Sequence, residues 1–199
     1  MLVHELLPLI SYAFVSSITP GPNNIMLTAS GISFGLKRTI PHLLGIPFGF
    51  GIQLALCAYG LGAFLLYIPA ANVALKLFGS GYLLYLAWSL RVNVVGSSAN
   101  DSSGKPMSFF NAALFQFANP KAWIMAVTGA SVFLPPYQPF VLSVATLCLV
   151  FCLINLPCVG AWAILGSAIK AHLSNPVWQR WFSGVIVVLT LYTAVAVWL

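Results

Sequence analysis

The chain has 199 residues, of which 60% are hydrophobic and only 5% are charged. Soluble domains carry roughly 25% charged residues, so this composition excludes an ordinary soluble domain and predicts an all-α protein that is surrounded by a lipid bilayer. The formal net charge of +6 does not indicate nucleic-acid binding, because the basic residues lie singly or in pairs at the ends of apolar segments.

Apolar segments of about 20 residues predict membrane-spanning helices. The first of them begins near the N-terminus. It is interpreted as a span and not as a signal peptide, because neither Lys nor Arg precedes it and no small-residue cleavage site follows it. Six spans are predicted, over residues 6–28, 41–66, 72–92, 108–133, 138–168 and 178–198.

The first predicted span is interrupted in its middle. Proline inside a helix removes a backbone hydrogen bond and clashes with the preceding turn, and Pro20 and Pro22 follow each other closely here. Unwound backbone is tolerated in a membrane only where it is buried in protein or lines a cavity. We therefore expect a broken helix beside a binding site, formed by Thr19, Pro20, Gly21, Pro22, Asn23 and Asn24.

The fourth predicted span has a corresponding interruption at Asn119-Pro120. Paired broken helices are typical of a transport site. Lys121 follows near the middle of this span, where a charge costs roughly 2.5–3.5 kcal/mol on insertion scales. No Asp or Glu lies deep in any predicted span. Lys121 is therefore expected to bind backbone carbonyls and Asn side chains, to lose its proton, or to bind an anion such as the carboxylate of an amino acid.

Gln53 and Asn155 are further polar residues within predicted spans, and each could equally serve only to tie helices together. Lys121 is also the candidate for proton coupling, because it could release its proton when the substrate leaves. No catalytic residue, metal ligand or cofactor is expected. The candidate substrate-binding residues are Pro20, Gly21, Pro22, Asn23, Asn24, Gln53, Asn119, Pro120, Lys121 and Asn155.

The two halves of the chain resemble each other weakly. Residues 18–31 (ITPGPNNIMLTASG) are similar to residues 117–130 (FANPKAWIMAVTGA), although such short similarity also arises by chance in apolar segments. Each half contributes three spans, an odd number, so the second half would insert upside down relative to the first. This pattern predicts a single transporter domain, 1–199, built from inverted repeats 1–93 and 108–199 with a cytoplasmic linker at 94–107.

The basic residues predict the orientation. One side of the predicted protein has only Lys76 in its connections, and the other side has six Lys and Arg residues. Cytoplasmic connections carry the excess of positive charge, so both termini are expected outside. The six residues are Lys37, Arg38, Arg91, Lys105, Lys170 and Arg180.

Through the TPGPNN motif of the first span and the NPK motif of the fourth, the chain resembles the LysE/RhtB family of bacterial amino-acid exporters. The resemblance runs nearly end to end and includes Gly45 and Gly49 in the second span and the segment from Gly81 to Trp88 in the third. PGPNNI, LALCAYG and FQFAN make the cysteine/O-acetylserine exporter branch the most similar part of the family.

This resemblance implies a secondary transporter of the bacterial inner membrane that is not an enzyme. It would export amino acids from the cytoplasm at the expense of a proton or ion gradient. Because no acidic residue in the spans could hold a second positive charge, the substrate is expected to be a small neutral amino acid or a derivative. The implied partners are this substrate and the lipid bilayer, without nucleic acid, and a homo-oligomer is compatible with the pattern.

Two other functions remain open at this point. Cys57 and Cys158 are separated by nearly the repeat offset, so the chain could be a membrane thiol–disulfide electron carrier. Buried cysteine, however, usually behaves as a small hydrophobic residue. An aquaporin-like channel built on Asn-Pro half-helices is the other alternative, although Lys121 would obstruct a narrow pore.

Overall fold

The computed structural model describes residues 3–61, 105–136 and 139–170, with the side chains of 3–5 and 170 excepted, and scattered positions between 70 and 84 and between 181 and 195. All regular structure in these residues is helical, as the composition predicted. Most of the predicted third span (72–92), of the predicted sixth span (178–198) and of the linker (94–107) lies outside the described residues, as do Arg91 and Arg180.

Both predicted breaks are present. Helix α1 has 16 residues and reaches about 24 Å at 1.5 Å per residue, less than the roughly 30 Å of a bilayer core. Each half-helix therefore needs its neighbour to complete a span. The described elements are α1 (Val3–Ile18), α2 (Pro22–Phe34), α3 (Leu36–Leu56), the π-helical turn η1 (Cys57–Leu61), α6 (Phe109–Ala118), α7 (Pro120–Phe133) and α8 (Phe140–Lys170).

The connection between the first two spans is much shorter than expected. The sequence predicted that one helix ends at 28 and the next begins at 41, whereas α2 continues to Phe34 and α3 starts at Leu36. Gly35 alone makes the turn, with a φ of 78° that favours glycine. Lys37 and Arg38 consequently lie in the first turn of α3 and not in a loop.

Two described helices are long and apolar enough to cross a membrane, over Leu36–Leu61 and Phe140–Ile169. The first begins at Leu36 and not at the predicted 41, and residues 62–66 of the predicted span lie outside the described residues. The second agrees closely with the predicted 138–168. Helix α8 continues through Pro157 without a break. Near its end the first of these helices loosens into η1, where Gly60 has a φ of 107°.

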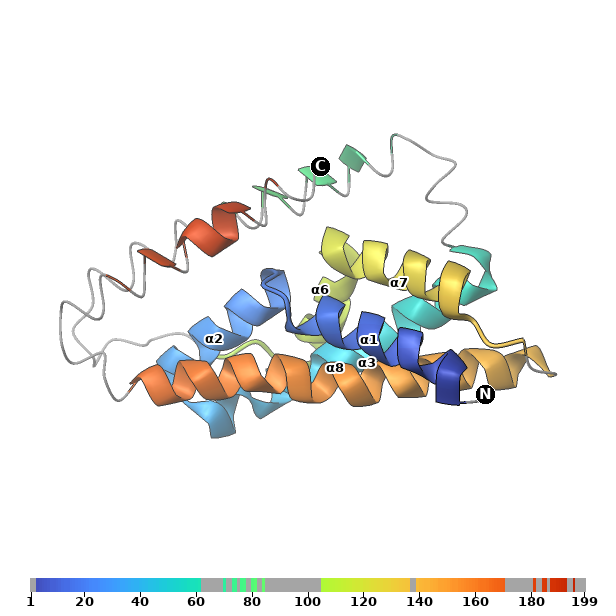
Figure 1. Cartoon of the computed structure of the whole chain (residues 1–199). Helices are drawn as coiled ribbons and strands as arrows, with labels where there is room; N and C mark the ends of the chain where they lie inside the picture. Colours follow the sequence, from blue (N-terminus) through green and yellow to red (C-terminus); the bar gives the residue numbers. More distant parts are fainter. Residues whose placement is uncertain are drawn as a thin grey trace.

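Helices α3 and α8 pack against each other, and α8 runs along the length of the described structure beside α1 (Figure 1). The half-helices α1 and α2 pack on α8, and the half-helices α6 and α7 pack on α3. The contact of α3 with α6 depends on glycine, because a Cβ at Gly49 would collide with the backbone carbonyl of Ala113. A Cβ at Gly166 on α8 would likewise collide with the carbonyl of Thr28 on α2. Small residues allow such close helix contacts in membranes.

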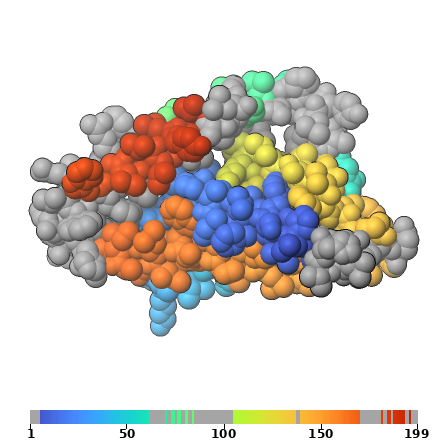
Figure 2. All heavy atoms as spheres, viewed as in Figure 1, coloured from blue at the N-terminus to red at the C-terminus, as the bar shows by residue number. Residues whose placement is uncertain are grey.

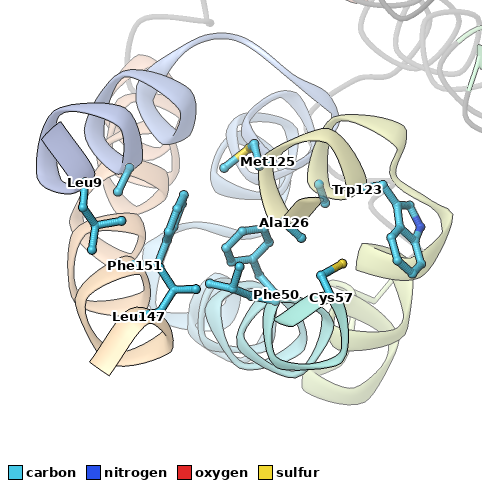
Figure 3. Packing of buried hydrophobic residues seen from close by; sticks show 11 residues of the cluster. Leu9, Phe50, Cys57, Trp123, Met125, Ala126, Leu147 and Phe151 are labelled. Carbon is cyan, nitrogen blue, oxygen red and sulfur yellow. The ribbon is translucent and has the colours of Figure 1, made fainter. Parts of the chain in front are cut away.

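Buried apolar side chains form two clusters. The larger one joins α1, α3, α7 and α8 around Phe50, Leu147 and Phe151 (Figure 3). The smaller one joins α2, α3, α6 and α8 around Leu27, Ile46, Ala112, Val159 and Ala163. The broken segments lie between these two clusters, so the clusters hold the breaks in place from both sides.

Many large apolar side chains are exposed on the outer faces of the described helices. On the face in Figure 2 the surface is formed largely by α1, α7 and α8. A soluble monomer rarely exposes extensive apolar surface, whereas lipid requires it. Exposed apolar residues of these three helices include Leu7, Phe14, Val15, Val132, Leu149, Leu153 and Ile164.

Candidate functional site

The break in the first span is fully supported by hydrogen bonds. A helix end leaves backbone carbonyls without intrahelical donors. Asn24 Nδ2 donates to the carbonyl oxygens of Ser17 and Thr19, at 2.9 and 2.8 Å. Trp162 Nε1 on α8 donates to the carbonyl of Ile18 at 3.0 Å. Side chains of α2 and α8 therefore satisfy the backbone carbonyls at the broken end of α1.

Lys121 reaches into the same break from α7. Its Nζ donates to the carbonyl oxygen of Thr19 at 2.8 Å, to Thr19 Oγ1 at 2.9 Å and to the carbonyl oxygen of Pro20 at 3.3 Å. A Cβ on Gly21 would lie 2.8 Å from Lys121 Cδ, so glycine makes room for this side chain. The structure shows the backbone carbonyls that the first of the three alternatives names, together with the Thr19 hydroxyl and without an Asn side chain at Nζ.

Two half-helices begin at the breaks, and each has proline in its first turn. Asn119 caps α7, because its Oδ1 accepts a hydrogen bond from the backbone N–H of Lys121 at 3.1 Å. Gly21 precedes α2 and has no side chain with which to cap it. The N-terminus of a helix attracts anions through its free N–H groups and its dipole. The start of α2 is therefore suited to an anion, while the start of α7 already has its cap.

Gln116, which the sequence analysis did not select, links the two breaks. Its side-chain amide pairs reciprocally with that of Asn23, at 2.8 and 3.2 Å. Gln53 Nε2 on α3 donates to the backbone carbonyl of Gln116 at 3.2 Å. The signal was present in the sequence, since Gln116 is a polar residue in an otherwise apolar stretch before Asn119.

Two buried amides are only half satisfied. Asn155 Nδ2 on α8 donates to Ser17 Oγ at 3.0 Å, but Asn155 Oδ1 has no hydrogen-bond partner among the described residues. Gln53 Oε1 is buried and lacks a described partner in the same way. Buried polar atoms without a partner are rare in native structures, so both oxygens indicate either a ligand or another conformation.

A small pocket opens where the two breaks meet. Its polar lining comes from α1, the two breaks, Gln116 on α6, and α8. Its apolar lining comes from Ile46, Phe50, Ala122, Met125 and Val159. The free volume is about 20 Å³, which holds about one water molecule, so an amino acid requires the pocket to widen. The other lining residues are Ser16, Ser17, Gly21, Pro22, Asn23, Asn24, Gln116, Asn119, Lys121 and Asn155.

The pocket brings together most of the residues that the sequence selected. Pro20, Pro120 and Gln53 are the exceptions, since they are absent from its described lining. Pro20 and Gln53 nevertheless bind lining residues, namely Lys121 and Gln116. Lys121 is the only charged residue among the described lining residues. The site thus combines one cation with several amides and an apolar wall.

The four cysteines are free thiols. Cys57 belongs to the larger apolar cluster (Figure 3). Cys158 on α8 lies 4.0 Å from the carbonyl oxygen of Phe14. Neither thiol lines the pocket, so the electron-carrier alternative gains no support from the geometry of the breaks.

Comparison with known proteins identifies the family of the chain. A family model described as LysE type translocator matches residues 14–199. The cysteine/O-acetylserine efflux proteins of Escherichia coli O139:H28 (strain E24377A / ETEC) and of Escherichia coli K12 are each 29% identical to the chain over 188 residues. These residues cover 94% of the chain and 94% of each relative. The protein of the same name from Shigella flexneri is similar to the same extent. No solved structure matches the chain.

Proposed function

Because the chain belongs to the LysE family of translocators, we propose that it is a secondary transporter that exports small neutral amino acids or their derivatives from the cytoplasm. The relatives named as cysteine/O-acetylserine efflux proteins suggest cysteine and O-acetylserine as the first substrates to test. The observation that carries the proposal is a single cation, Lys121, in a pocket where two broken helices meet.

The substrate carboxylate would bind between Lys121 and the start of α2. Lys121 Nζ is within 3.3 Å of three oxygens of Thr19 and Pro20, and a rotation of its flexible side chain would present the ammonium to the pocket. The uncapped N-terminus of α2 adds backbone donors from Asn23 and Asn24. Charge-assisted hydrogen bonds of this kind are about twice as strong as neutral ones.

The proposed architecture is a pair of inverted repeats, 1–93 and 108–199, with six spans in the bacterial inner membrane. Under this arrangement α1, α2 and α3 correspond to α6, α7 and α8. The helix contacts are compatible with it, because the contact of α2 with α8 has its counterpart in α7 with α3. The contact of α3 with α6 has its counterpart in α8 with α1. In such transporters one repeat moves against the other around a central site.

Proton coupling through Lys121 completes the proposal. No carboxylate is present among the described pocket residues, so Lys121 is the one group there that could carry a proton in the relevant pH range. The cycle would alternate between a protonated Lys121 that holds substrate and a neutral Lys121 after release. Export driven by an imposed pH gradient, and absent without one, is the behaviour that this coupling requires.

Counterflow in proteoliposomes tests the function. Vesicles preloaded with unlabelled substrate should accumulate labelled O-acetylserine or cysteine, with threonine and leucine as weaker competitors and lysine as the weakest. Preferred transport of lysine would refute the neutral-substrate proposal, because no described acidic group could hold its second positive charge. The double variant Cys57→Ala/Cys158→Ala should transport normally, whereas loss of transport would revive the electron-carrier alternative.

A further inference from the structure

Asn155 has an acceptor atom without a donor inside the pocket. The residue is 4% exposed, and it lines the pocket from α8. Its Nδ2 donates a hydrogen bond to Ser17 Oγ, whereas its Oδ1 has no described partner. Leaving a buried acceptor unpaired is unfavourable, and a ligand that donates a hydrogen bond to it would remove that cost.

The described lining of the pocket also contains one cation, Lys121, and several amides besides Asn155. Lys121 and the start of α2 offer donors, which suit a carboxylate, but they cannot bind the ammonium group of an amino acid. Carboxylate side chains are absent from the described lining. The free acceptor of Asn155 is therefore the complement that a zwitterion needs. Gln53 has a similar free oxygen, but Gln53 is not part of the described lining.

Building on the proposed amino-acid export, we propose that Asn155 Oδ1 accepts a hydrogen bond from the α-ammonium group of the substrate and so selects substrates with a free amino group. The carboxylate lies toward Lys121, and the substrate side chain lies against the apolar wall of Ile46, Phe50 and Met125. A neutral acceptor binds one ammonium without attracting a second cation. This explains how a site without a carboxylate can still recognise a zwitterion.

Two isomers provide a direct test. O-acetylserine and N-acetylserine have the same atoms, but the acetyl group of the second lies on nitrogen and removes the ammonium. Proteoliposomes with the unaltered protein, assayed at mildly acidic pH to slow acetyl transfer from oxygen to nitrogen, should transport O-acetylserine and reject N-acetylserine. Asn155→Leu should lower the transport efficiency for O-acetylserine about 10- to 100-fold, the range expected for a lost hydrogen bond to a charged group, and it should reduce the discrimination between the isomers.

Asn155→Asp tests whether the side chain at position 155 accepts or donates the hydrogen bond with the substrate. Aspartate keeps the acceptor and has no N–H, so it should retain transport of O-acetylserine within a few-fold. If Asn155→Asp is as inactive as Asn155→Leu, transport requires the N–H of the amide and not its oxygen, and the proposal is wrong. Unchanged transport and unchanged isomer discrimination in Asn155→Leu would overturn it as well.

Matched controls keep these outcomes interpretable. Cys158→Ala changes a buried residue one turn further along α8 that does not line the pocket, and it should behave like the unaltered protein. Asn155→Ala replaces the leucine variant if size-exclusion chromatography shows that the latter is misfolded. Absence of any amino-acid transport by the unaltered protein would instead refute the proposed function, and that result is distinguishable from a failure of Asn155 alone.

Discussion

Lys121 shows how a charge is kept inside a span. Placing it there costs roughly 2.5–3.5 kcal/mol on insertion scales, and three hydrogen bonds to oxygens of Thr19 and Pro20 offset part of that cost. These oxygens follow the C-terminal end of α1, where the helix dipole is negative. The stabilising partner is therefore the broken backbone itself, and the same contact joins α7 to the end of α1.

Lys121→Met should abolish export while leaving a folded, inserted protein. Methionine is less costly than lysine in lipid, but the carbonyl of Pro20 loses its described donor. We therefore expect a stability loss of no more than about 1–3 kcal/mol. Export by counterflow and thermal unfolding in detergent measure the two effects separately. Thr19→Val is the matched control, because it removes one of the three oxygens and keeps both carbonyls, and it should reduce export less. Normal pH-driven export by Lys121→Met would show that the residue is only structural.

Some parts of this site could be predicted from the sequence because they conflict with an apolar helix. Pro20 and Pro22 flank Gly21, and Pro120 follows Asn119, which together disfavour a continuous helix, whereas the single Pro157 does not break α8. Lys121 is conspicuous among apolar neighbours. The role of Gln116 could not be predicted, because pairing with Asn23 depends on how two distant segments meet. Whether Lys121 binds carbonyls, loses its proton or binds an anion likewise could not be predicted, because it depends on how close Lys121 lies to the break in the first span.

At the level of the helices, hydropathy located the two long described spans better than the turn between α2 and α3. Residues between 28 and 41 alternate apolar and polar side chains, which resembles a connection, yet nearly all of them are helical. Gly35 ends α2 through a hydrogen bond from its N–H to the carbonyl of Gly31 at 2.9 Å. A turn made by one residue leaves little trace in a hydropathy pattern. The breaks were predictable because proline has a local effect, whereas this turn depends on how α2 and α3 pack.

The contact of α3 with α6 predicts a contrast between two glycines of one helix. In Gly49→Ala the new Cβ meets the backbone of Ala113, which cannot move without shifting α6. In Gly51→Ala it lies 3.1 Å from Cys152 Sγ, which can rotate away. Overpacking costs about 1–3 kcal/mol, so Gly49→Ala should lower the Tm by several degrees and Gly51→Ala much less. Equal Tm values for both variants would show that α6 moves freely relative to α3.

At the scale of the whole molecule, Lys37, Arg38, Lys105 and Lys170 gather at one end. Helices α3 and α6 run in the same direction, since Gly45 lies against Phe109 and Gly49 lies against Ala113. Their starts therefore lie together. Lys37 and Arg38 at the start of α3 are exposed, as is Lys105 shortly before α6.

The end of α8 lies at the same basic end of the molecule as the starts of α3 and α6. Ser167 Oγ accepts a hydrogen bond from the backbone N–H of Leu36 at 3.3 Å, so the last turn of α8, which ends at Lys170, lies beside the start of α3. The smaller apolar cluster, around Leu27 and Ala163, lies between this basic end and the pocket. The larger cluster closes the pocket from the opposite side. In the proposed orientation, export requires the smaller cluster to open for loading and the larger one to open for release.

This grouping supports the orientation with both termini outside. Lys and Arg near span ends favour the cytoplasm, and Lys37, Arg38, Lys105 and Lys170 all belong to one end of the molecule. A reporter enzyme that is active only in the cytoplasm, fused after Leu199, should therefore be silent, whereas the same reporter inserted in the linker near Lys105 should be active. A reporter that is active only outside the membrane should give the reverse pattern. If the fusion after Leu199 is active in the cytoplasm, either the last span does not cross or the whole protein is inverted. The linker fusion distinguishes these two cases, because only inversion silences it.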